Sequence, residues 1–207
     1  MGTKINPDYT FKHNLYSLLP ALRVYKDQVL RGYLPIRFFS LQRKTNIVYK
    51  DQSFKNELFK IQKIKSFGFA YNFSVVSDDL ELSNFHLKHC GQYSYFKRNK
   101  WNIYLGSKLI GLIHEDTSNI TFLRDWLFII PVIGESLAEI FFLAKKTLTV
   151  YDSTPKASNK IARIIIRRNL FQIKLELYLD PSFKPYGEIY YLGVGLILSL
   201  IEVSRFR

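Results

Sequence analysis

The chain has 207 residues, of which 16% are aromatic, and it carries a formal net charge of +13. This length suits one well-buried domain or at most two small ones, and the abundant Phe and Tyr favour pleated, half-buried strands. A lone cysteine, Cys90, excludes a disulfide framework and any zinc site built from several thiolates. The basic balance favours an anionic partner, which could be nucleic acid, an acidic lipid surface or an acidic protein. The same charge can also serve only solubility.

Residues 1–40 are expected to form a segment that packs on the rest of the domain. Within it the stretch Pro20–Gly32 predicts a helix, because proline suits the first helical position and glycine commonly follows a helix end. Leu22, Tyr25 and Val29 would share one face of this helix. We expect that face to pack against the fold, and an amphipathic helix on a membrane surface is the alternative.

From residue 41 onward one pattern recurs, in which a short alternating strand, a polar turn and a second strand follow one another. The clearest copies are Asn46–Ile61, Trp101–Ile113 and Leu148–Ile166. Further stretches rich in aromatic and β-branched residues are Ser66–Val76, Ile120–Ile130, Ser136–Ala144 and Phe171–Leu179. Together they predict about twelve strands, and a closed antiparallel barrel leaves none of these with an exposed edge.

The last apolar stretch, residues 187–203, predicts a helix buried inside that barrel. Its charge-free part, from Ile189 to Ile201, would be roughly 20 Å long as a helix, whereas the hydrocarbon core of a bilayer is about 30 Å thick. Glu188 and Glu202 bracket it. A helix that is apolar on every side yet too short to span a membrane is typical of a protein core. A membrane anchor is the alternative.

The end of the chain resembles phospholipid scramblases and related tubby-like domains, the plant LURP-one-related proteins among them. The resemblance rests on a final strand, an aspartate-bearing turn and a hydrophobic helix, matched by Phe171, Ile173, Asp180, Leu196, Ile197, Leu200 and Ile201. The stretches "YLGSKLIGLI" and "VYDSTPKASNKIARI" resemble the hairpins of that family. The resemblance covers residues 41–207 and implies a barrel of twelve strands around a hydrophobic C-terminal helix.

One departure from that family concerns calcium. Scramblases carry a carboxylate-rich segment, proposed to hold calcium, just before the closing helix. The matching stretch here, Arg168–Gln172, has no acidic residue. Since calcium requires several oxygen ligands including carboxylates, we do not expect calcium to control this protein. Tubby proteins hold phosphoinositides with basic residues on the barrel wall, but those positions cannot be matched one by one to this chain.

Candidate catalytic chemistry is sparse. His86, His89 and Cys90 could supply three metal ligands, but the second ligand pair of a structural zinc site is missing, and we interpret the stretch as a solvated loop. The carboxylate pairs Asp78–Asp79 and Glu115–Asp116 lie among turn residues and are interpreted as surface turns. No glycine-rich phosphate loop or nucleophile elbow is present. We therefore predict a protein that is not an enzyme and needs no metal or cofactor.

The basic residues are the most informative candidates. We expect an anion- or lipid-binding site formed by Lys60, Lys63, Lys65, Arg163, Arg167 and Arg168. Such clusters at strand ends and turns would decorate one rim or wall of the barrel and could meet lipid phosphates. Further basic clusters lie at residues 97–100 and 145–146. The alternative to a binding site is a solvated face that protects strand edges.

The predicted function is a non-enzymatic barrel module that associates with anionic phospholipid membranes or with a lipid-like ligand. The alternative is a protein-interaction or nucleic-acid-binding module that uses the same positive face. Nucleic acid is the less favoured partner, because only Tyr93–Trp101 interleaves aromatic residues with lysines. The start of the chain lacks the apolar core of a signal peptide, which favours the cytoplasm, including the inner face of its membrane.

Overall fold

The computed structural model describes residues 6–14, 17, 20–36, 45–64, 72–77, 85–90, 100–116, 146–153, 159–168, 171–181 and 187–204. The described residues form twelve strands and one helix: β1 (Tyr9–Asn14), β2 (Ala21–Lys26), β3 (Val29–Pro35), β4 (Thr45–Tyr49), β5 (Glu57–Ile64), β6 (Asn72–Val76), β7 (Phe85–His89), β8 (Lys100–Leu105), β9 (Lys108–Glu115), β10 (Lys146–Asp152), β11 (Lys160–Arg168), β12 (Gln172–Leu179) and α3 (Glu188–Ser204).

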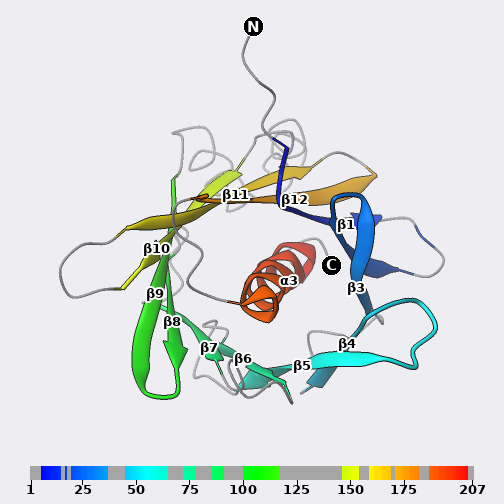
Figure 1. The fold of residues 1–207 in the computed structure, drawn as a ribbon, viewed down its shortest axis with the longest axis horizontal. Coiled ribbons are helices and arrows are strands. Elements are labelled where there is room, and N and C mark those ends of the chain that lie inside the picture. Colours follow the sequence, from blue (N-terminus) through cyan, green and yellow to red (C-terminus); the bar gives the residue numbers. More distant parts are fainter. Residues whose placement is uncertain are drawn as a thin grey trace, which may run out of the picture.

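The strands close into a single antiparallel barrel. Each strand pairs with its neighbours in the sequence, and β1 pairs with β12 to complete the ring (Figure 1). The closing ladder runs from Tyr9 opposite Leu177 to Asn14 opposite Gln172. Closure gives every strand two hydrogen-bonded neighbours, which removes the exposed edges of an open sheet. The predicted closed antiparallel barrel is confirmed.

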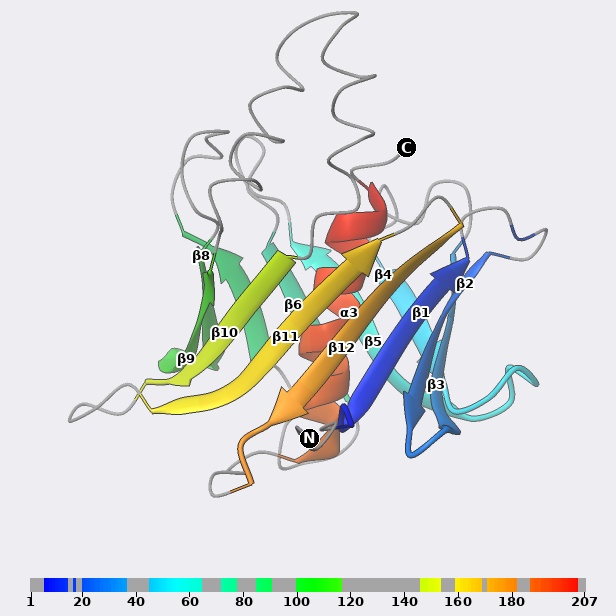
Figure 2. The same ribbon diagram turned by 90° about the horizontal axis from the view of Figure 1, so that it is seen from above.

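The hydrophobic C-terminal helix, α3, runs through the inside of the barrel (Figures 1 and 2). Its core residues Leu196, Ile197 and Leu200 are fully buried. They belong to one hydrophobic core with buried side chains of the strands, such as Phe11 and Phe85. This confirms the prediction that residues 187–203 form the buried centre of the fold. None of the described residues belongs to a helix that is both long and apolar enough to cross a bilayer.

Glycines let two aromatic rings of the wall touch the helix backbone. A Cβ atom added to Gly195 would lie 2.1 Å from Cζ of Phe11, and one added to Gly193 would lie 2.6 Å from Cζ of Phe85. Ordinary contacts between carbon atoms are about 3.5–4.0 Å. The two glycines therefore act as slots for rings from β1 and β7, and they fix how the helix is placed in the barrel.

The helix predicted at Pro20–Gly32 is wrong, because these residues belong to the β2–β3 hairpin. Leu22 and Val24 face the core, while Arg23 between them faces outward, which is the period of a strand. The turn consists of Asp27 and Gln28, both with positive φ, at 49° and 65°. Two such residues form the type of turn that matches the twist of a hairpin.

The prediction that residues 1–40 form a segment outside the barrel is also wrong. This part of the chain provides β1, β2 and β3. Without β1 the barrel could not close, because β1 is the strand that β12 pairs with. The N-terminal residues are thus part of the wall.

Most of the predicted hairpins have the expected positions. The pairs β4–β5, β8–β9 and β10–β11 cover the three repeated hairpins, and β12 covers the last predicted strand. The predicted strands Ile120–Ile130 and Ser136–Ala144 lie outside the described residues, as does the first part of Ser66–Val76. The stretch from His86 to His89, interpreted as a loop, instead lies in β7.

Candidate functional site

Four basic side chains form one row across four adjacent strands on the outside of the barrel. The row, hereafter the cationic row, consists of Arg167 on β11, Lys174 on β12, Lys12 on β1 and Arg23 on β2, each directly opposite the next. Figure 2 looks onto this wall, where β11, β12 and β1 run side by side in front of α3. Neighbouring strands are about 4.8 Å apart, so the row spans about 14 Å.

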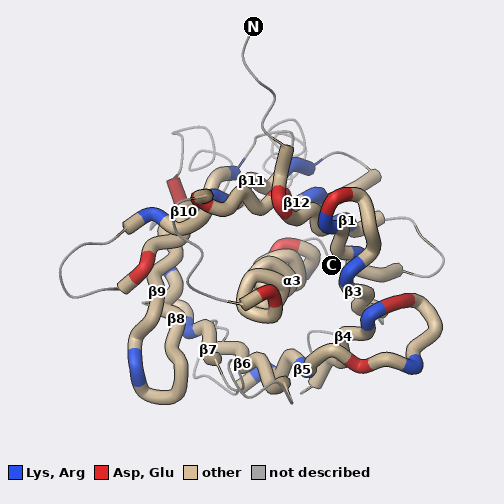
Figure 3. The backbone as a smooth tube through the Cα atoms, viewed as in Figure 1, with Lys and Arg blue, Asp and Glu red and all other residues tan. Residues whose placement is uncertain are grey.

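The strand period explains why all four members of the row face outward. Along each strand, alternate residues face the helix, as Phe11, Leu22, Ile166 and Ile173 do. The residues that follow or precede them must then face away from the core. Figure 3 shows basic segments in blue on the neighbouring strands β12 and β1.

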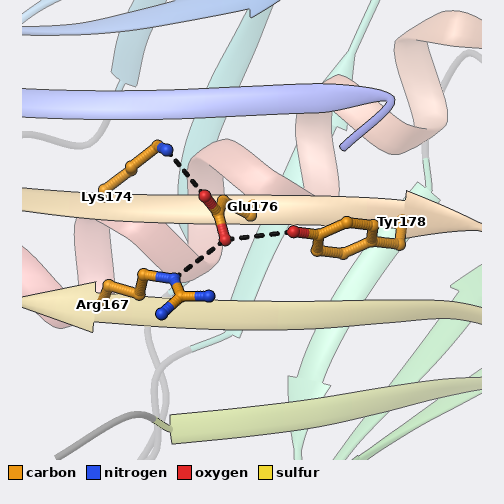
Figure 4. A network of polar contacts seen from close by, with 4 residues as sticks. All are labelled: Arg167, Lys174, Glu176 and Tyr178. Atoms are coloured by element: carbon orange, nitrogen blue, oxygen red, sulfur yellow. Dashed lines mark hydrogen bonds and ion pairs between the residues drawn. The ribbon is translucent and has the colours of Figure 1, made fainter. Parts of the chain in front are cut away.

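The row gathers like charges at positions where a sheet normally avoids them. Residues directly opposite in antiparallel strands have Cβ atoms about 5 Å apart, and like charges there are destabilising. At its Arg167–Lys174 end the row is balanced by one carboxylate, Glu176 (Figure 4). Arg167 Nε donates to Glu176 Oε2 at 3.0 Å, and Lys174 Nζ donates to Oε1 at 2.6 Å. The hydroxyl of Tyr178 donates to Oε2 at 3.2 Å.

The electrostatic state of Glu176 follows from these contacts. Burial of the carboxylate acts to raise its pKa, but the hydrogen bonds and charges of Lys174 and Arg167 outweigh burial and hold the pKa below its usual range. For Tyr178, burial and the neighbouring Glu176 raise the pKa of the phenol. At neutral pH Glu176 is therefore an anion held between two cations.

The other end of the row is bordered by aromatic rings. Nζ of Lys12 lies 5.2 Å from the ring centroid of Tyr25, and the guanidinium of Arg23 lies 5.8 Å from that of Tyr33. These are cation–π distances. No carboxylate among the described residues pairs with Lys12 or Arg23. This half of the row is available to an external anion.

An aromatic platform continues the row beyond Arg23. Tyr33 lies directly opposite Arg23 on one side and Tyr49 on the other. Phe54, from the β4–β5 loop, packs edge-on against both tyrosines, with ring centroids 5.6 and 5.2 Å away. Phe54 is 50% exposed and has a positive φ of 59°, a conformation that is uncommon for a bulky residue. On this side of the barrel, the cationic row therefore ends next to the half-exposed ring of Phe54.

A hollow of about 690 Å³ lies beside the centre of the row. Its lining consists of Asn6, Pro7, Thr10, Lys12, Tyr25, Asp27, Gln28 and Lys174. Two members of the cationic row, Lys12 and Lys174, therefore border a space that a charged group could enter. Amides, hydroxyls and one carboxylate surround them.

The residues predicted from the sequence divide between different places. Arg167 belongs to the cationic row. Arg163, four residues earlier on β11, is also exposed on the outer face and lies opposite Tyr178. Lys60 and Lys63 lie on β5, on another side of the barrel, where Lys60 pairs with Glu57 at 3.1 Å. Lys65 lies outside the described residues.

The prediction of Arg168 as a surface residue is wrong. Adjacent residues of a strand face opposite sides, so Arg167 faces outward while Arg168 faces the lumen with 8% exposure. There it forms an ion pair with Glu202 of α3. Lys146 Nζ, also inside, lies 3.2 Å from Glu202 Oε1 and 3.2 Å from Glu115 Oε2.

These four side chains form a buried ion cluster that ties β9, β10 and β11 to the end of α3. The interpretation of Glu115 as a surface-turn residue is corrected, since it is the last residue of β9 and is buried. Lys146, expected in a surface basic cluster, is buried as well. Opposite charges in contact offset much of the cost of removing them from water.

The sequence reasoning missed Lys12, Arg23 and Lys174. Lys12 and Arg23 lay in the part of the chain that was not assigned to the barrel. Lys174 is a single lysine within a predicted strand and belongs to no run of basic residues. The available signal was strand alternation, which places all three on the solvent side.

The possible metal ligands do not come together. His86 and His89 are three positions apart on β7, which places them on opposite faces of the strand. Burial raises the pKa of the Cys90 thiol, so this thiol is less ionised than an exposed one. The described residues contain no group of His, Cys, Asp and Glu side chains suited to a metal ion.

No protein-family model matches the chain, and comparison with curated proteins and with solved structures gives no significant match either.

Proposed function

We propose that this protein is a non-enzymatic barrel module that binds anionic phospholipid surfaces through the cationic row. The observation that carries the proposal is the register of Arg167, Lys174, Lys12 and Arg23, which places four cations in one row. Glu176 contacts only the first two of them. An arrangement that is unfavourable for the free sheet becomes favourable when an anionic surface supplies the missing charge. The site differs from the sequence prediction, but the class of partner is the same.

The expected strength of such binding is moderate. Each Lys or Arg close to an anionic membrane contributes about 1 kcal/mol, so four of them could contribute about 4 kcal/mol before orientation costs. Phe54 is half-exposed at the aromatic end of the row, where it could enter the headgroup region beside the charges. A charge row with an apolar end suits a peripheral contact in which the wall lies on the membrane.

The proposed relationship to the tubby-like and scramblase superfamily has one structural support. A closed antiparallel barrel with a buried C-terminal helix is the architecture that the resemblance implied. Under this proposal the protein works at the cytoplasmic face of a membrane. The residues that carry binding are those of this chain's own wall.

Flotation with liposomes tests the proposal. The protein is mixed with vesicles that contain phosphatidylserine or only phosphatidylcholine, at low salt and at about 0.5 M salt, where the Debye length is only about 4 Å. We expect flotation only with the anionic vesicles and only at low salt. Binding that persists at high salt, or equal binding to neutral vesicles, would contradict an electrostatic contact.

A matched pair of variants locates the contact on the protein. Lys12→Gln with Lys174→Gln removes two charges from the cationic row, and Lys88→Gln with Lys108→Gln removes two exposed charges from β7 and β9. At about 1 kcal/mol per cation, the first pair should weaken binding roughly 25-fold. The second pair should change it much less. Equal losses would assign binding to net charge alone.

Nucleic acid is the second candidate partner, because the partly exposed rings of Tyr25 and Phe54 lie at the same end of the wall as Lys12 and Arg23. Rings beside basic residues can stack bases of a single strand while the cations hold its phosphates. A single-stranded DNA shift assay at the same low salt compares the two. If DNA binds and vesicles do not, the wall is a nucleic-acid interface. If neither binds, an acidic protein becomes the favoured partner.

A further inference from the structure

We propose that Glu176 is a built-in competitor that holds Arg167 and Lys174 in the free protein and releases them to an anionic surface. This inference rests on the proposed function and concerns how the same site is regulated. The cationic row then has two halves. Lys12 and Arg23 are always available to an external anion, whereas Arg167 and Lys174 bind it only after they leave Glu176.

The contacts of Glu176 place it below the cations that it holds. Its side chain is 8% exposed, while those of Arg167 and Lys174 are 53% and 33% exposed. An external anion can therefore reach both cations from the solvent side without passing the carboxylate. To displace Glu176, an external anion needs only that the long side chains of Arg167 and Lys174 rotate away from the carboxylate. Figure 4 shows both side chains in contact with it.

The position of Glu176 in the sheet explains why it reaches toward the row. Its direct cross-strand neighbours are Thr10 on β1 and Ile165 on β11, and neither carries a charge. The nearest cations are Lys174, two residues earlier on the same face of β12, and Arg167 diagonally across on β11. Both contacts are made by flexible side chains, and these can exchange partners without a change in the barrel.

The carboxylate keeps a partner after release, which makes the exchange feasible. The Tyr178 hydroxyl donates to Glu176 Oε2 at 3.2 Å and comes from the same strand. When Arg167 and Lys174 turn to an external anion, this hydrogen bond still satisfies one oxygen of the carboxylate. A buried carboxylate without any donor would be costly, and Tyr178 lowers that cost.

The arrangement predicts a threshold in the response to charge density. A sparse anionic surface meets only Lys12 and Arg23, which have no carboxylate partner among the described residues. A dense surface also competes with Glu176 and recruits the other two cations. Binding should therefore rise more steeply with the fraction of anionic lipid than binding by four independent cations would.

The test compares Glu176→Gln with Glu57→Gln in the full-length protein. Both changes remove one negative charge that pairs with a cation, but Glu57 pairs with Lys60 on β5, away from the row. Partition into phosphatidylserine–phosphatidylcholine vesicles is measured as a function of the phosphatidylserine fraction. Glu176→Gln should raise the partition coefficient roughly 5- to 30-fold, because one or two cations become free at about fivefold each. It should also remove the steep threshold.

The outcomes separate this inference from the proposed function. If Glu176→Gln gains no more than Glu57→Gln, or keeps the threshold, Glu176 is not a competitor although the row still binds. If neither the wild type nor Glu176→Gln binds anionic vesicles at low salt, the proposed function fails and this inference fails with it. Tyr178→Phe is a second variant that retains the charge: without the hydroxyl, Glu176 loses the hydrogen bond that it keeps after release, so release of the two cations costs more and binding should fall roughly two- to tenfold. An unchanged or higher affinity would overturn the inference.

Discussion

Substitution of Gly195 by Ala tests how closely the central helix fits the barrel. In an isolated helix this change is favourable by about 1 kcal/mol, because glycine loses more backbone freedom than alanine. Here the new Cβ would lie 2.1 Å from Cζ of Phe11 and 2.6 Å from each Cε of the same ring. Relief of the contact requires a shift of about 1.5 Å to reach a normal carbon–carbon distance.

The surroundings of Phe11 leave little room for that shift. The ring is 1% exposed, and β1 is hydrogen-bonded on both sides by β2 and β12. Overpacking of a well-packed core typically costs about 1–3 kcal/mol, occasionally more. We expect Gly195→Ala to destabilise the protein by about 1–2 kcal/mol net. For a domain of this size each kcal/mol corresponds to about 2–4 °C in Tm, so Tm should fall by about 2–8 °C.

Urea denaturation and calorimetry measure the effect, and a double-mutant cycle with Phe11→Leu identifies its cause. The smaller side chain leaves space that the new methyl group can fill, so Gly195→Ala should cost less in the Phe11→Leu background. Gly193→Ala, where the closest contact is 2.6 Å from Phe85, should have a smaller effect than Gly195→Ala. An increase in stability on Gly195→Ala would refute the packing of α3 against β1.

Two further predictions concern buried and partly buried charges. Lys146→Met should lower the free energy of unfolding by about 3–5 kcal/mol, because Glu115 and Glu202 lose the ammonium group that both contact; a loss below about 1 kcal/mol in urea denaturation would contradict this role. Burial and the adjacent Lys100 lower the pKa of His114. Lys100→Gln should therefore raise the pKa of His114 in an NMR titration. An unchanged pKa would assign the shift to burial alone. Because the folded-state pKa of His114 is lowered, its contribution to stability is present above the unfolded pKa of about 6.5 and is lost as the pH falls.

The barrel and its central helix could be predicted because their signals are local. An apolar stretch too short for a bilayer and bracketed by Glu188 and Glu202 indicates a buried helix. Hairpins such as β8–β9 combine alternation with turn residues that tolerate positive φ, as Gly106 does at 60°. Each of these signals lies within about twenty residues and needs no knowledge of the partner strands.

The N-terminal hairpin was missed because two patterns overlap in the same residues. Leu22, Tyr25 and Val29 have helical spacing, while Leu22 and Val24 have the spacing of a strand. The turn at Asp27 and Gln28 contains no glycine, although both residues have positive φ. The tertiary pairing of β2 with β1 and β3 decided the outcome.

The candidate site could not be predicted because it depends on long-range register. Lys12 and Lys174 face each other only because the first and last strands close the barrel. The buried ion cluster likewise joins residues from three strands and α3, and runs such as Arg167–Arg168 give no indication of which member faces the lumen. Only the parity of the neighbouring buried residues, such as Ile166, decides that.

The most direct test of the account is which side of the barrel meets an anionic membrane. A fluorophore is attached to a single cysteine in a Cys90→Ser background, either at Asn14→Cys on β1 or at Lys88→Cys on β7. Both positions are exposed, and the two strands lie on opposite sides of α3 (Figure 1). Vesicles of brominated anionic lipid quench a fluorophore that lies at the bilayer. The account predicts strong quenching at position 14, two residues from Lys12, and little at position 88. Equal quenching, or stronger quenching at position 88, would contradict the cationic row as the membrane-binding surface.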